Sequence, residues 1–109
     1  MVEITKADWK LFREKIVGWQ EAYMARLNRE YMELLSADGD ASAKFWALEE
    51  RIRIDKKQPG VQLELKKSHV GWDLVRLLND GVITAADLEG FRQELREDVL
   101  HMAEVFRES

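Results

Sequence analysis

The sequence predicts an all-α fold: a four-helix bundle of a long, a medium, a short and a long helix, in a single domain that spans residues 1–109. Apolar side chains recur at steps of three and four residues along most of the chain, which is the spacing of one helix face. Clusters of Ser, Thr, Asp and Gly interrupt this pattern. With 109 residues, 46% of them hydrophobic, the chain is long enough for one core and too short for a second catalytic domain.

A long first helix is predicted from about Lys6 to Leu35. Thr5, followed three residues later by Asp8, resembles a capping box that starts a helix. The polar residues from Ser36 onwards end it. The apolar stripe between these limits consists of Trp9, Phe12, Ile16, Trp19, Tyr23, Leu27, Tyr31 and Leu34.

A second helix is predicted to start at a cap formed by Asp40 or Ser42 and to end before Pro59. We expect its inward face to consist of Phe45, Leu48 and Ile52. Trp46 and Ile54 lie off this face, and a helix with apolar residues on two sides usually has two neighbours.

Residues 61–65 alternate between apolar and polar side chains, as a strand does. Val61 and Leu65 also fit one helix face that is entered after Pro59. No other stretch reads as a strand that could pair with this one inside the chain. An extended or irregular connector is therefore the prediction, with strand and helix as alternatives.

The third helix is expected to be short, capped by Ser68 and ended at Gly81. Its apolar face carries Trp72, Val75 and Leu78. Thr84 with Asp87 is expected to start a fourth helix that runs nearly to the end of the chain. The stripe of this last helix consists of Leu88, Phe91, Leu95, Val99, Met102 and Val105 or Phe106.

The segment from Leu77 to Leu88 reads Leu-Leu-Asn-Asp-Gly-Val-Ile-Thr-Ala-Ala-Asp-Leu. It resembles the helical hairpin of short C-terminal oligomerisation modules (SHOCT-like), and Arg92 after Phe91 loosely matches the family's basic residue. The resemblance covers residues 77–92 and implies a helical hairpin that turns at Gly81. The whole chain also resembles small uncharacterised all-helical proteins of bacteria, a resemblance that implies no activity.

Positive charge is concentrated in one segment. The formal net charge is −4, but residues 51–67 carry six basic and only two acidic side chains. This segment could offer nucleic acid a positive surface. The alternative is a solvated loop and helix end, where lysine offsets the negative end of the helix dipole. The basic residues are Arg51, Arg53, Lys56, Lys57, Lys66 and Lys67.

The sequence offers no complete catalytic or metal-binding pattern. Glu94, Asp98 and His101 share one face of the predicted last helix, but the carboxylates and histidine of a second helix, which a di-iron bundle needs, are missing. There is no nucleophile elbow, no glycine-rich phosphate loop and no cysteine. We also find no signal peptide or membrane span. We therefore expect a cytoplasmic, non-enzymatic protein with neither metal nor cofactor.

Four tryptophans in 109 residues are the most informative side chains for function. Tryptophan is costly to expose and is enriched at the centres of protein interfaces. Trp46 lies off its helix stripe and is the best candidate for an interface residue. The residues expected to act as packing or interface anchors are Trp9, Trp19, Tyr23 and Trp46.

The predicted first helix is too long for a compact monomer. About 30 residues span about 45 Å, whereas a compact chain of this size is about 35 Å across. Either the helix bends at Gly18, giving a kinked monomeric bundle, or its projecting end is covered by another chain. The second reading favours a homodimer, so the leading function is a helical interaction or self-association module. The alternative is a nucleic-acid accessory protein that uses the basic segment, with Trp46 stacked on an unpaired base.

Overall fold

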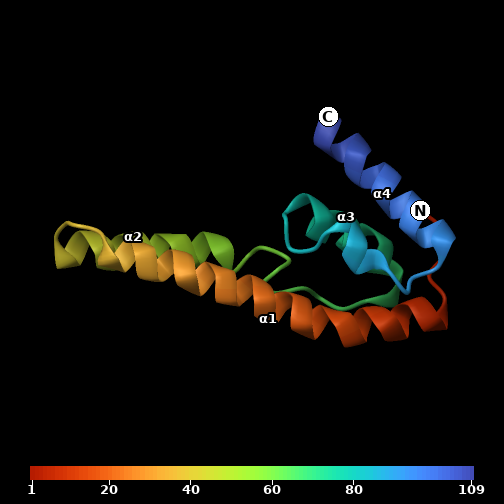
Figure 1. Cartoon of the computed structure of the whole chain (residues 1–109), viewed down its shortest axis with the longest axis horizontal. Helices are drawn as coiled ribbons and strands as arrows, with labels where there is room; N and C mark the ends of the chain where they lie inside the picture. Colours follow the sequence, from red (N-terminus) through yellow and green to blue (C-terminus); the bar gives the residue numbers. More distant parts are fainter.

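The computed structural model describes all residues from 1 to 109 and contains helices but no strand (Figure 1). This confirms the predicted all-α fold with four α-helices. In chain order the elements are α1 (Lys6–Ser36), α2 (Ala41–Asp55), the 3₁₀-helix η1 (Lys67–His69), α3 (Val70–Asn79), the 3₁₀-helix η2 (Ala85–Leu88) and α4 (Gln93–Glu108).

The long helix α1 is continuous through Gly18. Its predicted capping box is present: the N–H of Asp8 donates to Thr5 Oγ1 over 3.1 Å, and the N–H of Thr5 donates to Asp8 Oδ2 over 3.0 Å. At 1.5 Å per residue, α1 is about 46 Å long, close to the longest dimension of the molecule, 52 Å. Because α1 does not break at Gly18, its C-terminal half projects beyond the core.

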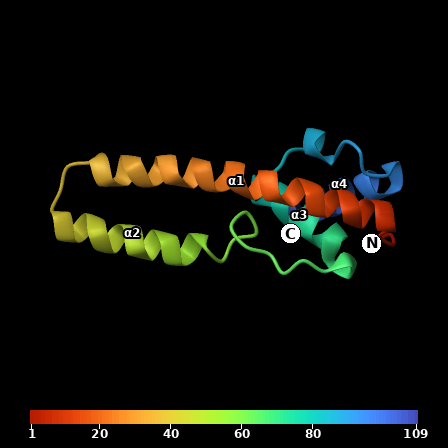
Figure 2. The ribbon, with the colours of Figure 1, turned by 90° about the horizontal axis from the view of Figure 1, so that it is seen from below.

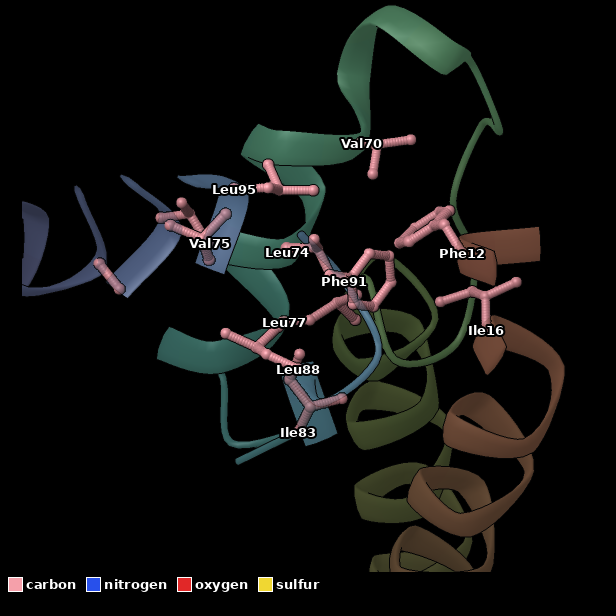
Figure 3. Packing of buried hydrophobic residues seen from close by; sticks show 12 residues of the cluster. Phe12, Ile16, Val70, Leu74, Val75, Leu77, Ile83, Leu88, Phe91 and Leu95 are labelled. Atoms are coloured by element: carbon pink, nitrogen blue, oxygen red, sulfur yellow. The ribbon is translucent and has the colours of Figure 1, made fainter. Parts of the chain in front are cut away.

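The core lies around the N-terminal half of α1 (Figure 3). Phe12 and Ile16 are the contribution of α1, and every other core residue comes from the segment 70–103. Trp19 packs at the margin, edge to face with Phe12 at 6.3 Å between ring centres. The 12 buried residues are Phe12, Ile16, Val70, Leu74, Val75, Leu77, Ile83, Leu88, Phe91, Leu95, Val99 and Ala103.

The third helix starts later than predicted. Ser68 lies inside η1, and α3 itself begins at Val70. Trp72 was expected on the inward face but is exposed, because Leu74 and Leu77 turn towards the core. The predicted end is confirmed, since Gly81 has a φ of 74° and turns the chain away.

The start of the last helix is also corrected. Thr84 and Asp87 form a capping box, but this box opens η2 rather than α4. Gly90 then adopts a φ of 96°, which brings Phe91 into the core before α4 begins at Gln93. With 16 residues α4 is about 24 Å long. The length of α4 therefore gives no reason to expect a partner chain, whereas the length of α1 does.

The second helix presents a different face to α1 than predicted. Phe45 and Ile52 are exposed, whereas Lys44, Leu48, Arg51 and Asp55 are the half-buried or buried positions. Both sets follow steps of three and four residues, so spacing alone does not separate them. Hydrogen bonds from the second set to α1, described below, decide the orientation.

Residues 61–65 form an irregular connector between α2 and η1, as predicted. The start of the connector is fastened to α1: Gln20 Nε2 donates to the carbonyl oxygen of Pro59 over 3.0 Å. The Tyr23 ring lies against Gly60, where a Cβ atom would overlap the ring. Leu63 packs at the margin of the core.

The molecule consists of two regions that share α1 (Figure 2). The body comprises residues 1–16 and 67–109 and holds all 12 core residues. The hairpin comprises residues 17–55, with the two helices lying side by side. Within the hairpin only Leu27 and Asp55 are buried.

Candidate interaction surface

Polar side chains occupy the interior of the hairpin. The Tyr31 hydroxyl donates to Asp55 Oδ2 over 2.6 Å. Arg51 donates to Glu30 over 2.8 Å and pairs with Asp55 at 3.1 Å. These four residues join α1 to α2 near the end of α2, where the chain enters the connector.

The electrostatics of this network favour its hydrogen-bonded form at neutral pH. Burial raises the pKa of Tyr31 to about 12, and the hydrogen bond to the Asp55 carboxylate adds to the effect. The bond to Glu30 raises the pKa of Arg51. Tyr31 therefore remains a donor and Arg51 a cation throughout the physiological range.

Large apolar side chains lie on the outside of the hairpin. Phe45 is 61% exposed and Trp46 is 64% exposed, and their rings meet edge to face at 5.0 Å. Ile52 and, on α1, Met32 are exposed as well. The hairpin thus combines Leu27, Leu48 and a polar network between its helices with large apolar groups that face solvent.

Two adjoining shallow grooves connect these apolar residues. One groove, of about 350 Å³, lies along α2 between Phe45 and Lys56. The other, of about 280 Å³, lies between α1 and α2 and is lined by Met24, Leu27 and Tyr31. Ile52 and Lys56 line both grooves, so the grooves belong to one surface.

The same surface continues along α1. Positions 17, 21, 24, 28, 31 and 35 follow steps of four and three residues and form one stripe of the helix. Val17 and Leu35, at its two ends, are exposed. We call this stripe, together with the two grooves and Trp46, the outer face. Its large apolar residues outside the hairpin interior are Val17, Met24, Leu35, Phe45, Trp46 and Ile52.

The four predicted anchors lie in different environments. Trp19 and Tyr23 are half-buried inside the monomer, on Phe12 and Gly60 respectively. Trp9 is half-buried at the margin of the core, with the Arg13 guanidinium 4.9 Å above its ring. Only Trp46 lies on the outer face.

The six predicted basic residues do not form one patch. Arg51 and Arg53 are paired with acidic residues of the hairpin, Arg53 with Glu50. Lys56 and Lys57 follow at the end of α2, and both are exposed. Lys66 and Lys67 lie at the far end of the connector, beside η1.

Lys66 and Lys67 line a cleft at the end of the body. This open cleft, of about 980 Å³, also contains Trp9 and Trp72. Lys67 forms no ion pair, and Lys66 meets Glu64 at 3.3 Å between exposed side chains. The complete lining is Met1, Val2, Glu3, Ile4, Trp9, Leu65, Lys66, Lys67, Ser68 and Trp72.

Two buried carboxylates in the body were not identified as special from the sequence. Asp8 is buried and accepts a 2.9 Å hydrogen bond from Arg92 Nε, across 84 residues of chain. Asp73 is buried in α3, and its Oδ2 atom has no hydrogen-bond partner. The burial of both carboxylates and the pairing of Asp8 with Arg92 depend on tertiary contacts, so no local residue spacing predicts them. The Thr5–Asp8 capping box was the one visible signal.

The comparisons and the remaining chemistry add no further assignment. A scan against family models, a search of curated proteins and a search of solved structures each found no match. The structure gathers no group of three or more His, Cys, Asp or Glu side chains that could hold a metal ion. None of its helices combines the length and the apolar character needed to cross a bilayer.

Proposed function

We propose that this protein is a non-enzymatic helical module that self-associates through the outer face of the hairpin. The observation that supports the proposal is the set of large aromatic and aliphatic side chains exposed on the hairpin, beside an interior that a hydrogen-bonded polar network holds together at the end of α2. Burial of one large apolar side chain contributes about 1.5–3 kcal/mol. A contiguous apolar surface of this kind is typical of an interaction site.

A second copy of the chain is the simplest partner that buries this apolar surface. Most soluble oligomers are symmetric homo-oligomers, and one self-complementary face suffices for a dimer. The projecting half of α1, about 27 Å between Val17 and Leu35 at 1.5 Å per residue, supplies a contact of useful length. A cytoplasmic location belongs to the proposal, because a chain without cysteine needs no oxidising compartment.

The proposal is tested by light scattering over a concentration series. We expect a mass near twice 12.8 kDa for the natural chain. Replacing Phe45 and Ile52 by serine should raise the dissociation constant at least about tenfold, because both side chains lose apolar burial. Leu100 and Val105 on α4 provide the control, since both are exposed apolar side chains of the body outside the cleft. A monomer at every concentration, or an equal effect of both double variants, would overturn the proposal.

The nucleic-acid alternative has less support, because the basic residues are divided between the hairpin and the cleft and two of them are paired within the hairpin. It predicts binding of a fluorescent oligonucleotide that weakens as salt rises. No binding at low salt would remove it.

A further inference from the structure

The cleft in the body has the chemistry of a receptor for an acidic, apolar segment. Trp9 and Trp72 supply two aromatic side chains, and Lys66 and Lys67 stand at its edge. Lys66 pairs with Glu64 and Glu3 also lines the cleft, whereas Lys67 forms no ion pair. Lys6, Lys10 and Arg13, on the turns of α1 next to Trp9, are exposed and form no ion pair. An aromatic surface bordered by cations favours a ligand that carries both carboxylate and apolar groups.

The tip of the hairpin, residues 36–40, has the complementary chemistry. Asp38 and Asp40 are exposed, and neither side chain forms an ion pair or a hydrogen bond. Asp40 occupies the N-cap position of α2, but its carboxylate accepts no hydrogen bond from the backbone N–H groups of the helix. The exposed aromatic pair Phe45 and Trp46 follows about one helical turn later. The tip therefore presents free carboxylates beside aromatic rings.

The geometry of the fold relates the tip to the cleft. The tip lies at one end of α1, and the N-terminal residues that line the cleft lie at the other end (Figures 1 and 2). We consider two copies whose outer faces pack antiparallel, so that Val17 of one copy meets Leu35 of the other. The midpoint of this contact then lies near Arg26 of each copy. This register brings Asp38 of one copy about 8 Å along α1 from Trp9 of the other, within reach of a lysine side chain. A parallel dimer would instead place the acidic tips side by side.

We propose that the cleft of each copy receives the acidic hairpin tip of a second copy, in an antiparallel dimer with two identical tip–cleft contacts. This inference rests on the proposed self-association and adds its direction, its register and a second contact region. Asp38 and Asp40 face Lys66 and Lys67, whereas Phe45 and Trp46 lie further back along α2 and remain in the outer-face contact. Because the contact is symmetric, each chain is both donor and receptor.

Charge exchange tests the contact by sedimentation equilibrium. The cleft variant Lys66→Glu/Lys67→Glu and the tip variant Asp38→Lys/Asp40→Lys should each raise the dimer dissociation constant at least about tenfold, because like charges then meet twice per dimer. The four-residue exchange should restore the dissociation constant to within about threefold of the natural chain. Arg76→Glu/Arg107→Glu makes the same change of net charge as the cleft variant elsewhere on the body and should leave association unaffected.

The decisive test of the tip–cleft contact is to mix the cleft variant with the tip variant. In the mixed dimer one contact is natural and the other is exchanged, so both are attractive, and the heterodimer should form where neither variant associates alone. If the cleft variant dimerises like the natural chain, or the mixture associates no better than its components, the tip–cleft contact is overturned while self-association through the outer face stands. A natural chain that remains monomeric overturns both.

Discussion

The body and the hairpin use the same kinds of side chain in opposite places. In the body, 12 apolar residues meet in one core. In the hairpin, Tyr31, Arg51 and Asp55 lie between the helices, while Phe45 and Trp46 face solvent. These core side chains are removed from water and stabilise the body, although Trp72 and Phe106 remain exposed on its surface. The hairpin keeps its apolar surface available, which is what a binding element requires.

The largest expected effect is on the free energy of unfolding, and it is found by truncating one leucine in each region and comparing the two losses. Leu74 is fully buried in the body, so Leu74→Ala should lower the free energy of unfolding by about 3 kcal/mol. Leu35 is exposed on the hairpin, so Leu35→Ala should change the stability of the monomer by less than about 0.5 kcal/mol. Urea unfolding at low protein concentration measures both. Equal losses would mean that the hairpin is as tightly packed as the body.

The buried ion pair of the body gives the next largest effect. Burial alone would raise the pKa of Asp8, but the hydrogen bonds from Thr5 and Arg92 outweigh it, and the pKa is lowered. Asp8 therefore stabilises the fold above its unfolded pKa near 4, and this contribution is lost as pH falls through the lower folded pKa. Asp8→Asn should cost about 2 kcal/mol at pH 7, and urea unfolding should show this cost shrinking as pH falls through the folded pKa.

The control for Asp8 is the second capping box. Asp87 makes the equivalent contact to Thr84 at the start of η2, but it has no buried arginine partner. Asp87→Asn should cost at most about 1 kcal/mol at pH 7. If Asp87→Asn lowers the free energy of unfolding as much as Asp8→Asn does, the contribution of Asp8 comes from capping and not from the ion pair with Arg92.

The unpaired carboxylate of Asp73 should give an effect of opposite sign. Burial raises the pKa of Asp73, against the attraction of His69 and Arg76. The folded state therefore favours the protonated carboxyl, and stability falls as pH rises from the unfolded pKa near 4 through the raised folded pKa. Asp73→Asn should increase the free energy of unfolding by about 1 kcal/mol at pH 7, with no gain at pH 3. Thermal unfolding at the two pH values measures this, and destabilisation at pH 7 would show that the charged form has a partner.

The smallest effect should be confined to the hairpin. Tyr31→Phe removes one hydrogen bond to Asp55, which keeps its pairing with Arg51. We expect a loss of about 1 kcal/mol or less. Hydrogen exchange should show faster opening of α2 and no change in α3 or α4, because the bond lies outside the core. Faster exchange in all helices would show that the two regions unfold together.

Local patterns predicted the elements better than their orientation. The Thr5–Asp8 box and the turn at Gly81 depend on neighbouring residues, and both are present. The inward face of α2 was wrong because Phe45 and Ile52 share their spacing with Arg51 and Asp55, and only partners on α1 decide between the two sets. The delayed start of α4 depends on Phe91 entering the core, which is a tertiary contact.

For the same reason, only part of the candidate interaction surface could be predicted from the sequence. Trp46 could be singled out because it departs from the stripe of its helix. The outer face as a whole could not, because it combines α1 and α2 in a register that the connector and the Tyr31–Asp55 bond determine. The cleft joins Trp9 to Lys67 across about half of the chain length, and no sequence spacing indicates that proximity.

Gly18 marks the point where α1 leaves the body and enters the hairpin. It is exposed, and a Cβ atom there would meet nothing within 4 Å, so packing does not demand glycine at this position. Glycine inside a helix is about 1 kcal/mol less favourable than alanine. The junction is therefore the position of α1 with the lowest helix propensity, and its backbone has more conformational freedom than that of its neighbours. Two hairpins attached through such a junction can adjust their angle to each other while each body keeps its packing.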